Sequence, residues 1–439
     1  MYIEIQDENW AQFRDINDKI LWEKIRKFLS YSTPTYFGGK VHYQRVFLVH
    51  GITKKFSVGL IPLLLSKFPS LQVVDKRPKH EKLTIPLSDE LEEYQRTILE
   101  QALRVERAVI TLPTGSGKSY MISYLCTQIL EKYPDKQICI VVPSIEILHQ
   151  IKKNLPSDKT GLVWSNKQET DKPIIITTGQ TLNSRFDEFN VDKILENVSI
   201  LITDEAHHVG SNTFYKISFL FPKAFIRLGF SSTPKGRSDG ADLKIVGVFS
   251  STFLNVDSKQ ISRIVPVEIL MIKYPVTTSG LCISMEYNDL LDFEPRKQAI
   301  IQIAKRLSSS ELTWLMFVDR LSLGEELSKA LDVPFVNASN PDRRDLFQQL
   351  QEKKILGVIT TVGKEGLDII SLSSIINTSR ISTPIDLIQK VGRVRRRAED
   401  KDQALVIDFY DDVTDNVLNW TKKRMSIYKQ VGNVTVGNL

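Results

Sequence analysis

The chain has 439 residues, of which 42% are hydrophobic and 25% charged, and its formal net charge is +6. This is the composition of an ordinary globular protein, and the length predicts about two to four domains at roughly 150 residues each. The mild positive charge is compatible with a polyanionic partner but does not require one. The three cysteines, Cys126, Cys139 and Cys282, stand far apart in apolar stretches, which excludes a zinc cluster and favours buried free thiols in a reducing compartment.

No stretch has the pattern of a signal peptide or of a membrane segment. Residues 1–8 are already acidic and amphipathic, unlike a signal peptide. The longest apolar runs, residues 59–65 and 138–143, are far shorter than the roughly 20 residues that span a bilayer. We therefore expect a cytoplasmic protein, in the host cytoplasm if a phage encodes it, that does not contact a membrane.

Residues 1–82 predict a small α+β domain. Its expected elements are strands at residues 1–5 and 45–49 and apolar helices at residues 16–29 and 60–68. Residues 75–82 are charged and contain a proline, so we place the linker to the next domain there.

Within this domain, residues 31–45 interleave aromatic and basic side chains around a turn at Gly38 and Gly39. Such a ribbon can lay rings and cations against nucleic acid. Half-buried rings on the face of a sheet are an equally good interpretation. The candidate DNA contacts here are Tyr36, Phe37, Lys40 and Arg45, with Tyr31, His42 and Tyr43 beside them.

From residue 83 onward, apolar strands alternate with amphipathic helices, the pattern of a doubly wound parallel sheet. A first series of strands is expected at residues 108–112, 137–142, 174–177, 199–203 and 225–230. A second series is expected at residues 312–318, 356–361, 374–378 and 404–409. We therefore expect two α/β lobes in tandem, at residues 83–262 and 263–439.

The loop after the strand at residues 108–112 has the order that a phosphate site needs: strand, glycine turn, lysine, hydroxyl, helix. Gly115 and Gly117 allow successive N–H groups to point at one anion, at the positive end of a helix dipole. Lys118 would reach the β- and γ-phosphates of a nucleotide, and Ser119 would hold the metal. The expected ATP-binding residues of this loop are Pro113, Thr114, Gly115, Ser116, Gly117, Lys118 and Ser119.

This loop departs from the strict P-loop pattern, because Leu112 stands where that pattern has its first glycine. It is the shortened form Thr-Gly-x-Gly-Lys-Ser. An ordinary turn before a helix is the weaker alternative.

The apolar strand at residues 199–203 leads into Asp204, Glu205, Ala206 and His207. Side chains at the carboxyl edge of a parallel sheet face the crevice in which ligands bind. Asp204 can hold Mg²⁺ through water, and Glu205 can polarise the water that attacks the γ-phosphate. Together with the glycine loop at the same edge, these carboxylates predict an ATP-hydrolysing enzyme that uses ATP and Mg²⁺.

With these motifs, the chain from about residue 94 to its last helix resembles the superfamily-2 helicases and translocases of the DEAH-box type. The resemblance implies two tandem RecA-like lobes and an adenine-reading role for Gln95, to which an exposed surface glutamine is the alternative. The residues that it implies for gripping the DNA backbone in the first lobe are Ser144, Thr178, Gly179 and Gln180. It further implies that Ser231 and Thr233 couple hydrolysis to movement, although Ser232 stands where many relatives have alanine.

In the second lobe, the resemblance implies DNA contact by Thr360, nucleotide contact by Gly366 and Asp368, coupling by Gln389, and arginine fingers at Arg393 and Arg396. Guanidinium groups suit the charge that develops in a γ-phosphoryl transition state, because they are planar and always charged. A solvated basic helix face accounts better for Arg395 and Arg397.

Residues 25–31, 59–65 and 237–240 resemble the phage UvsW-type branch-migration helicases. This finer resemblance implies an ATP-dependent DNA helicase that acts on forks, displacement loops or four-way junctions in recombination, replication or repair. DNA would be held mainly at its phosphates, by a monomer whose other partners are replication or recombination proteins. The alternatives are an RNA helicase, a duplex translocase that does not separate strands, and a nucleic-acid-binding protein that ATP switches.

Overall fold

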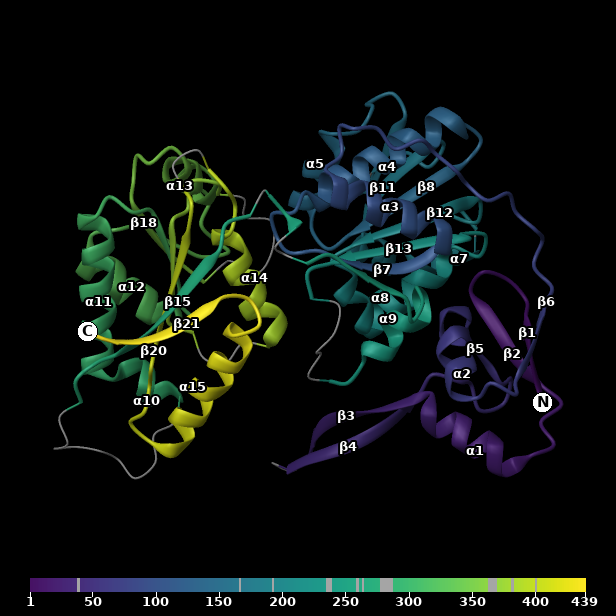
Figure 1. Ribbon diagram of the computed structural model, residues 1–439, viewed down its shortest axis with the longest axis horizontal. Coiled ribbons are helices and arrows are strands. Elements are labelled where there is room, and N and C mark those ends of the chain that lie inside the picture. The colour runs from purple at the N-terminus through teal and green to yellow at the C-terminus, as the bar shows by residue number, and fades with distance from the viewer. Residues whose placement is uncertain are drawn as a thin grey trace. The chain divides into compact units, whose positions relative to one another are not determined.

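The computed structural model describes residues 1–37, 40–165, 167–191, 193–233, 239–257, 260–262, 264–276, 287–361, 369–379, 383–398 and 401–439. The chain divides into two compact units. The first consists of Met1–Pro113 and Gly117–Ile261, and the second of Thr114–Ser116 and Ser262–Leu439. Each unit is built around a large sheet with helices packed on it (Figure 1).

The N-terminal part of the first unit is a four-stranded sheet in the order β5-β2-β1-β6. Its strands are β1 (Tyr2–Ile5), β2 (Trp10–Arg14), β5 (Lys55–Ser57) and β6 (Gln72–Asp75), and its helices are α1 (Lys19–Phe28), η1 (Val58–Leu60) and α2 (Ile61–Lys67). Ile3, Phe13, Trp22 and Phe56 form the centre of its apolar core. The predicted strand at the N-terminus and both predicted helices are confirmed.

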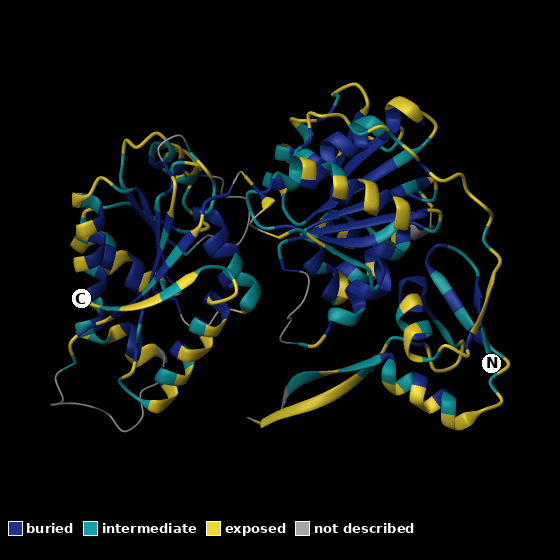
Figure 2. Ribbon diagram, viewed as in Figure 1, coloured by how far each residue is buried: buried dark blue, intermediate teal, exposed yellow. Residues whose placement is uncertain are grey.

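Strands β3 (Ser30–Phe37) and β4 (Lys40–Phe47) form a separate antiparallel hairpin in which Phe37 pairs with Lys40. The hairpin extends away from the N-terminal sheet, and β4 is exposed along most of its length (Figures 1 and 2). The predicted ribbon is therefore confirmed, whereas the strand predicted at residues 45–49 is wrong in its bounds because β4 ends at Phe47. Gly38 and Gly39 lie outside the described residues.

The first lobe contains an eight-stranded sheet in the order β10-β9-β11-β8-β12-β13-β7-β14. The strands are β7 (Arg107–Thr111), β8 (Gln137–Val142), β9 (Thr160–Trp164), β10 (Lys167–Gln168), β11 (Ile174–Thr178), β12 (Val198–Asp204), β13 (Ile226–Ser231) and β14 (Phe253–Asn255). All five predicted strands are present, and the central pairings are parallel. The strands that the sequence did not reveal, β9, β10 and β14, lie at the two sides of the sheet.

Helices precede and connect these strands. They are α3 (Glu93–Val105), α4 (Lys118–Lys132), α5 (Ile145–Lys152), α6 (Gly179–Ser184), α7 (Phe186–Val191), η2 (Ala206–Gly210), α8 (Asn212–Ile217), η3 (Ser218–Leu220) and α9 (Asp242–Val248). A cluster of buried apolar residues from β8, β11 and β12 packs against η2, α8 and α9. In open α/β sheets, ligands bind at the loops that follow the carboxyl ends of the strands.

The second unit contains a seven-stranded sheet in the order β17-β18-β16-β19-β20-β15-β21. The strands are β15 (Val267–Lys273), β16 (Trp314–Phe317), β17 (Phe335–Val336), β18 (Gly357–Thr360), β19 (Ser374–Asn377), β20 (Ala404–Phe409) and β21 (Asn433–Asn438). The helices are α10 (Tyr287–Asp292), α11 (Glu294–Ser309), α12 (Leu321–Leu331), α13 (Arg343–Gln351), α14 (Pro384–Val394) and α15 (Asp415–Tyr428). Among the described residues, the strands of this sheet pair in parallel.

Alternate residues of β16 belong to two different apolar clusters. Leu315 and Phe317 pack in one cluster, while Trp314 and Met316 pack in the other. Since successive side chains of a strand point to opposite faces, both faces of this sheet are covered. Two tandem parallel sheets with helices on both faces confirm the predicted α/β fold with two RecA-like lobes.

The N-terminal sheet is joined to the first lobe by buried polar contacts. Glu8 forms ion pairs with Arg107 at 2.9 Å and with Arg77 at 2.6 Å. Arg227, which is 1% exposed, donates to the side-chain oxygen of Asn9. These contacts fix the N-terminal sheet against β7 and β13, and residues 76–92 connect the two parts without a helix or strand. The domain boundaries drawn from the sequence stay predictions.

Two further observations concern the described residues. Their helices are all too short or too polar to cross a bilayer. Cys126 and Cys139 are free and buried, and burial raises the pKa of both thiols, which keeps them protonated. Cys282 lies outside the described residues.

Candidate nucleotide site and nucleic-acid interface

The glycine loop follows β7 and leads directly into α4, as the sequence predicts. Gly115 and Gly117 have φ values of +87° and +81°, in the left-handed region that favours glycine. Gly117 is the N-cap residue of the 15-residue helix α4, and Lys118 is its first residue. The Lys118 ammonium donates to the carbonyl of Leu112 at 3.4 Å, back across the mouth of the loop. The loop therefore places its backbone turn and its cation around one point at a helix N-terminus, which suits a phosphate group.

The remaining loop residues line the same turn. Ser116 is buried, and Pro113, Thr114, Gly115, Gly117, Lys118 and Ser119 are half-buried. The carbonyl of Ser119 accepts a hydrogen bond from the Ser123 hydroxyl at 3.0 Å, within the first turn of α4. Ser119 thus lies in the regular first turn of α4, directly after the loop.

Asp204 and Glu205 stand at the carboxyl end of β12. Asp204 is 4% exposed, and its Oδ1 accepts a hydrogen bond from the backbone N–H of Glu205 at 3.0 Å. Glu205 has φ +48° and ψ +55°, a left-handed conformation that costs a non-glycine residue roughly 1–2 kcal/mol. The chain turns sharply at this point, between the end of β12 and the start of η2.

The Glu205 carboxylate is buried among positive and hydrogen-bonding groups. Burial raises its pKa, but the positive charge of Lys118 and a hydrogen bond from His207 outweigh burial and lower the pKa to about 2. His207 Nδ1 lies 3.3 Å from Glu205 Oε2. Glu205 is therefore ionised at neutral pH, with the cation of the phosphate loop as its main counter-charge.

His207 also joins Glu205 to the segment predicted to couple hydrolysis to movement. Its Nδ1 lies 3.2 Å from the Ser231 hydroxyl, which accepts from the backbone N–H of Thr233 at 3.2 Å. Ser231 and Thr233 are both buried. No role of its own was predicted for His207, and its position two residues after Glu205 is the sequence signal that indicates one.

Gln95 is fully buried at the first turn of α3, which excludes an exposed surface glutamine. Its Oε1 accepts from the backbone N–H of Glu92 at 3.1 Å in a capping box, and its Nε2 donates to the Tyr94 hydroxyl at 3.3 Å. The amide is therefore oriented by its own helix terminus.

The predicted backbone-gripping residues of the first lobe lie at the carboxyl ends of β8 and β11, the sheet edge that also carries Asp204. Ser144 caps α5, and Thr178 caps α6 by accepting from the N–H of Thr181 at 3.2 Å. Gln180 is exposed. Gly179 lies against the ring of Phe214, where a β-carbon would overlap the ring. Residue 179 thus has to be glycine because the Phe214 ring leaves no room for a side chain.

The second unit carries the other predicted residues. Gln389 and Arg393 are buried on α14, and Arg396, just after this helix, is half-buried. Burial lowers the pKa of Arg396 and that of Arg395. The Thr360 hydroxyl is buried and donates to the carbonyl of Val336 at 2.9 Å.

The solvated-face interpretation holds for Arg397 alone of the two residues to which it was applied. Arg397 is exposed and donates to the carbonyl of Ser262 at 3.3 Å, whereas Arg395 is half-buried. Gly366 and Asp368 lie outside the described residues.

The hairpin presents two chemically different faces. Cross-strand pairing puts Val41, Tyr43, Arg45 and Phe47 on one face of β4, and Lys40, His42 and Gln44 on the other. Tyr43 is 74% exposed, so the interpretation of its ring as part of a half-buried sheet face is wrong. Tyr36 and Phe37 belong to β3, and their side chains lie outside the described part of the chain. Lys40 and Arg45 are exposed on opposite faces, which the sequence analysis did not anticipate.

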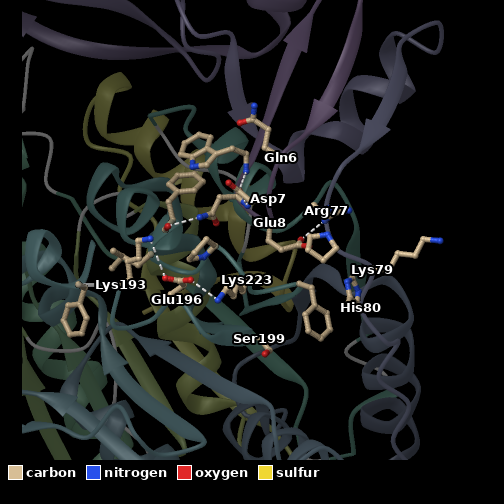
Figure 3. Close-up of a pocket in the computed structure, with 18 residues that line it drawn as sticks. Gln6, Asp7, Glu8, Arg77, Lys79, His80, Lys193, Glu196, Ser199 and Lys223 are labelled. Atoms are coloured by element: carbon tan, nitrogen blue, oxygen red, sulfur yellow. Dashed lines mark hydrogen bonds and ion pairs between the residues drawn. The ribbon is translucent and has the colours of Figure 1, made fainter. Parts of the chain in front are cut away.

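Figure 3 shows a pocket in the first unit that is lined by residues of the N-terminal region and of the first lobe. It is lined by Ser199, at the start of β12, and by Phe225, just before β13, so it opens at the amino-terminal edge. Lys223 and Glu196 form an ion pair there at 2.9 Å. The pocket belongs to the seam between the N-terminal sheet and the first lobe, and it is not the ATP site.

The donors at the P-loop edge fit a magnesium ion. Mg²⁺ prefers oxygen ligands and is usually bound by one or two protein groups together with substrate phosphates. The buried Asp204 carboxylate and the Ser119 hydroxyl are such groups. Among the described residues, no cluster of three or more histidine, cysteine or acidic side chains is arranged to hold a metal.

Two family models match the chain. The model described as "Type III restriction enzyme, res subunit" matches residues 88–236, which include the P-loop and Asp204, and the model described as "Helicase conserved C-terminal domain" matches residues 296–398. The second match includes α14 with Gln389 and Arg393.

Three viral relatives carry helicase names. Helicase 22 of Sulfolobus islandicus filamentous virus is 25% identical over 69% of this chain and 60% of that protein. Helicase D10 of Escherichia phage T5 is 25% identical over 98% of this chain and 94% of that protein. The ATP-dependent DNA helicase uvsW of Enterobacteria phage T4 is 21% identical over 72% of this chain and 68% of that protein.

A solved fragment assigned to the HsdR subunit of a type I restriction enzyme from Vibrio vulnificus shares the fold. Its TM-score is 0.63 at 14% identity, over 97% of this chain and 84% of that chain. The family models, the helicase relatives and the geometry of the P-loop edge lead to one conclusion. The chain belongs to superfamily 2 as an ATP-dependent helicase related to the UvsW-type phage helicases.

Proposed function

We propose that this helicase acts on branched DNA, unwinding or migrating forks, displacement loops or four-way junctions. The observation that supports this proposal best is the β3–β4 hairpin, an exposed ribbon that carries aromatic and cationic side chains outside the two motor lobes. Aromatic rings can stack on bases that are unpaired at a branch point, and cations can hold the flanking phosphates. The phage T4 relative is a DNA helicase by name, which favours DNA over RNA.

In the proposed site, ATP binds at the glycine loop, with Lys118 on its β- and γ-phosphates. Glu205 is the group that orients and polarises the attacking water, a role that its ionised state permits. Asp204 and Ser119 would hold Mg²⁺, which supplies positive charge to the phosphate oxygens. Gln95 would read the adenine. Thr114 and the other loop residues would cradle the phosphates.

Arg393 and Arg396 are the proposed arginine fingers, with Gln389 coupling and with Gly366 and Asp368 near the nucleotide. Charge on the transferring phosphoryl group grows toward the transition state, so a guanidinium acts more on the rate than on ATP affinity. His207 connects this chemistry to Ser231 and Thr233 in the first lobe.

DNA would cross the carboxyl edges of the two sheets. The residues proposed to contact it there are Ser144, Thr178, Gly179, Gln180 and Thr360. Contacts of this type go mainly to phosphates, so binding should depend strongly on salt and weakly on sequence.

A comparison of substrates tests the proposal. ATPase stimulation and strand separation are measured with single-stranded DNA, duplex DNA, a fork, a four-way junction and an RNA duplex. We expect the fork and the junction to be preferred. Preference for the RNA duplex would establish an RNA helicase, and ATP hydrolysis on duplex DNA without strand separation would establish a translocase. Binding without multiple turnovers would indicate an ATP-switched binding protein.

The hairpin is tested separately with a double variant, Tyr36→Ala with Phe37→Ala, and with Tyr43→Ala. Base stacking is worth roughly 1–3 kcal/mol for each ring, so the loss of two rings should weaken junction binding by about one to four powers of ten. ATPase stimulated by single strands should change much less. Ile20→Ala removes an exposed apolar side chain elsewhere in the N-terminal region and serves as the control. A folded double variant that keeps full junction preference would remove the hairpin from branch recognition.

A further inference from the structure

A continuous series of contacts through three rings links Glu205 to the segment Thr178, Gly179 and Gln180 of the first lobe. His207 contacts Glu205, and its ring centroid lies 4.4 Å from that of His208. The His208 ring lies 5.3 Å from the ring of Phe214. Phe214 in turn covers Gly179, the central residue of the segment Thr178, Gly179 and Gln180.

These residues belong to two short stretches of chain with little freedom to move independently. Residues 205–214 run from Glu205 through η2 into the first turn of α8. The Ser211 hydroxyl caps α8 by accepting from the N–H of Phe214 at 3.3 Å, which ties the two short helices together. Phe214 is 9% exposed, so its ring is held in the core.

The contact between Phe214 and Gly179 is close enough to transmit a displacement. The ring atoms Cζ, Cε1 and Cε2 occupy the space that a β-carbon at residue 179 would need. Protein interiors are close-packed, so a shift of α6 must be met by a shift of the ring or of α8. Gly179 of α6 and Phe214 of α8 are therefore in a contact through which the position of α6 depends on that of α8 and of η2 just before it.

The backbone of Glu205 is sensitive to such a shift. A left-handed conformation in a non-glycine residue persists only where the surrounding structure holds it, and η2 begins at the next residue. A displacement of about 1 Å at a catalytic group can change a rate about 100-fold. A change in the packing of Phe214 can thus move η2 and alter where the Glu205 carboxylate lies relative to the phosphate loop.

We infer that Phe214 and His208 are positioning residues that transmit DNA binding at Thr178, Gly179 and Gln180 to the catalytic carboxylate Glu205. DNA bound at this segment sets the position of α6, the packing of Phe214 follows, and η2 then holds Glu205 in its hydrolytic position. The inference rests on the proposed function, since it takes the DNA role of this segment and the catalytic role of Glu205 from it. It assigns the DNA-stimulated part of ATP hydrolysis to packing inside one lobe.

The test uses the steric fit between residues 179 and 214 in the full chain. Phe214→Leu removes the three ring atoms nearest to Gly179, and Gly179→Ala adds a methyl group at the same place. Each single variant should lose DNA stimulation of ATP hydrolysis at saturating DNA by about 5-fold or more, the lower end for coupled sites. The double variant, in which the methyl group fills the space left by the ring, should recover most of the stimulation. ATP hydrolysis without DNA should be unchanged in Phe214→Leu.

Two controls make the result specific. Phe68→Leu removes a ring from the pair that Phe68, just after α2, forms with Phe28 of α1, with centroids 5.6 Å apart, and should keep full stimulation. Gln180→Ala should weaken DNA binding. If Gln180→Ala binds DNA normally, the proposed DNA role of the segment fails. If Gln180→Ala weakens binding while folded Phe214→Leu keeps full stimulation, or if the double variant loses the product of both single losses, the coupling inference alone is wrong.

Discussion

Replacement of Glu205 by glutamine separates ATP binding from ATP hydrolysis. Glutamine has nearly the same shape, and it keeps a side-chain oxygen beside His207 Nδ1, which lies 3.3 Å from Glu205 Oε2. The variant loses the negative charge of the Glu205 carboxylate, whose ionised form Lys118 and His207 stabilise. The first lobe should therefore fold and bind ATP as before.

The expected size of the effect follows from the role of that charge. Loss of a group that polarises the attacking water typically costs about 10²–10⁴ in rate, or about 3–5 kcal/mol at 1.36 kcal/mol for each tenfold change. Because ATP binding is retained, the variant should accumulate in an ATP-bound and DNA-bound state. Its ATP affinity should stay within a few-fold of the unmodified protein, since the lost interaction acts on the water.

The assay measures phosphate release in a single turnover and at steady state, together with ATP and DNA affinity. Glu100→Gln, at an exposed position on α3, makes the same chemical change away from the site and should have no effect. If Glu205→Gln hydrolyses ATP at a rate close to that of the control, another group positions the water and the assignment of Glu205 is refuted.

Three other predictions test the phosphate loop, the arginine fingers and a buried lysine. Lys118→Ala should abolish hydrolysis but leave DNA affinity largely intact, and equal loss of both in a folded variant, by filter binding and ATPase assay, would contradict separate sites. Arg393→Ala should lower kcat by orders of magnitude with little change in ATP affinity, whereas Arg397→Ala should be nearly silent; equal damage would show that the finger register is wrong. Burial and the charge of Arg396 lower the pKa of Lys401 to about 8 from 10.5, so the unfolded chain binds more protons between these values and stability should rise with pH across that window. Denaturant unfolding of Lys401→Met should lack this slope, and an unchanged slope would assign the titration to another group.

The sequence predicted the parallel strands because they are buried on both faces and appear as continuous apolar runs. Residues 138–142 and 200–203 are examples, and both lie in the middle of the first sheet. Strands at the sides of the sheets were not predicted, because they are short or exposed and form no continuous apolar run. β14 has three residues, and β21 is largely exposed and carries polar residues between its valines. β15 was missed although it is mostly buried, because Glu268 and Lys273 break its apolar pattern.

The local part of the candidate site was also readable from the sequence. A glycine loop, a lysine and a helix start are neighbours in the chain, so their spacing alone defines a phosphate cradle, and the φ values of Gly115 and Gly117 fit it. Asp204 and Glu205 were placed correctly at the end of a strand for the same reason. The chemistry that depends on adjacent residues is determined by the order of those residues.

The contacts between distant segments required the tertiary structure. His207 Nδ1 lies 3.2 Å from the Ser231 hydroxyl, and Gly179 lies against the ring of Phe214. The division of the hairpin residues between two faces depends on which residues of β3 and β4 pair. The contacts His207–Ser231 and Gly179–Phe214 have no signal in residue order, because side-chain packing is decided by strand order and register, which bring together residues that the sequence separates by more than 20 positions.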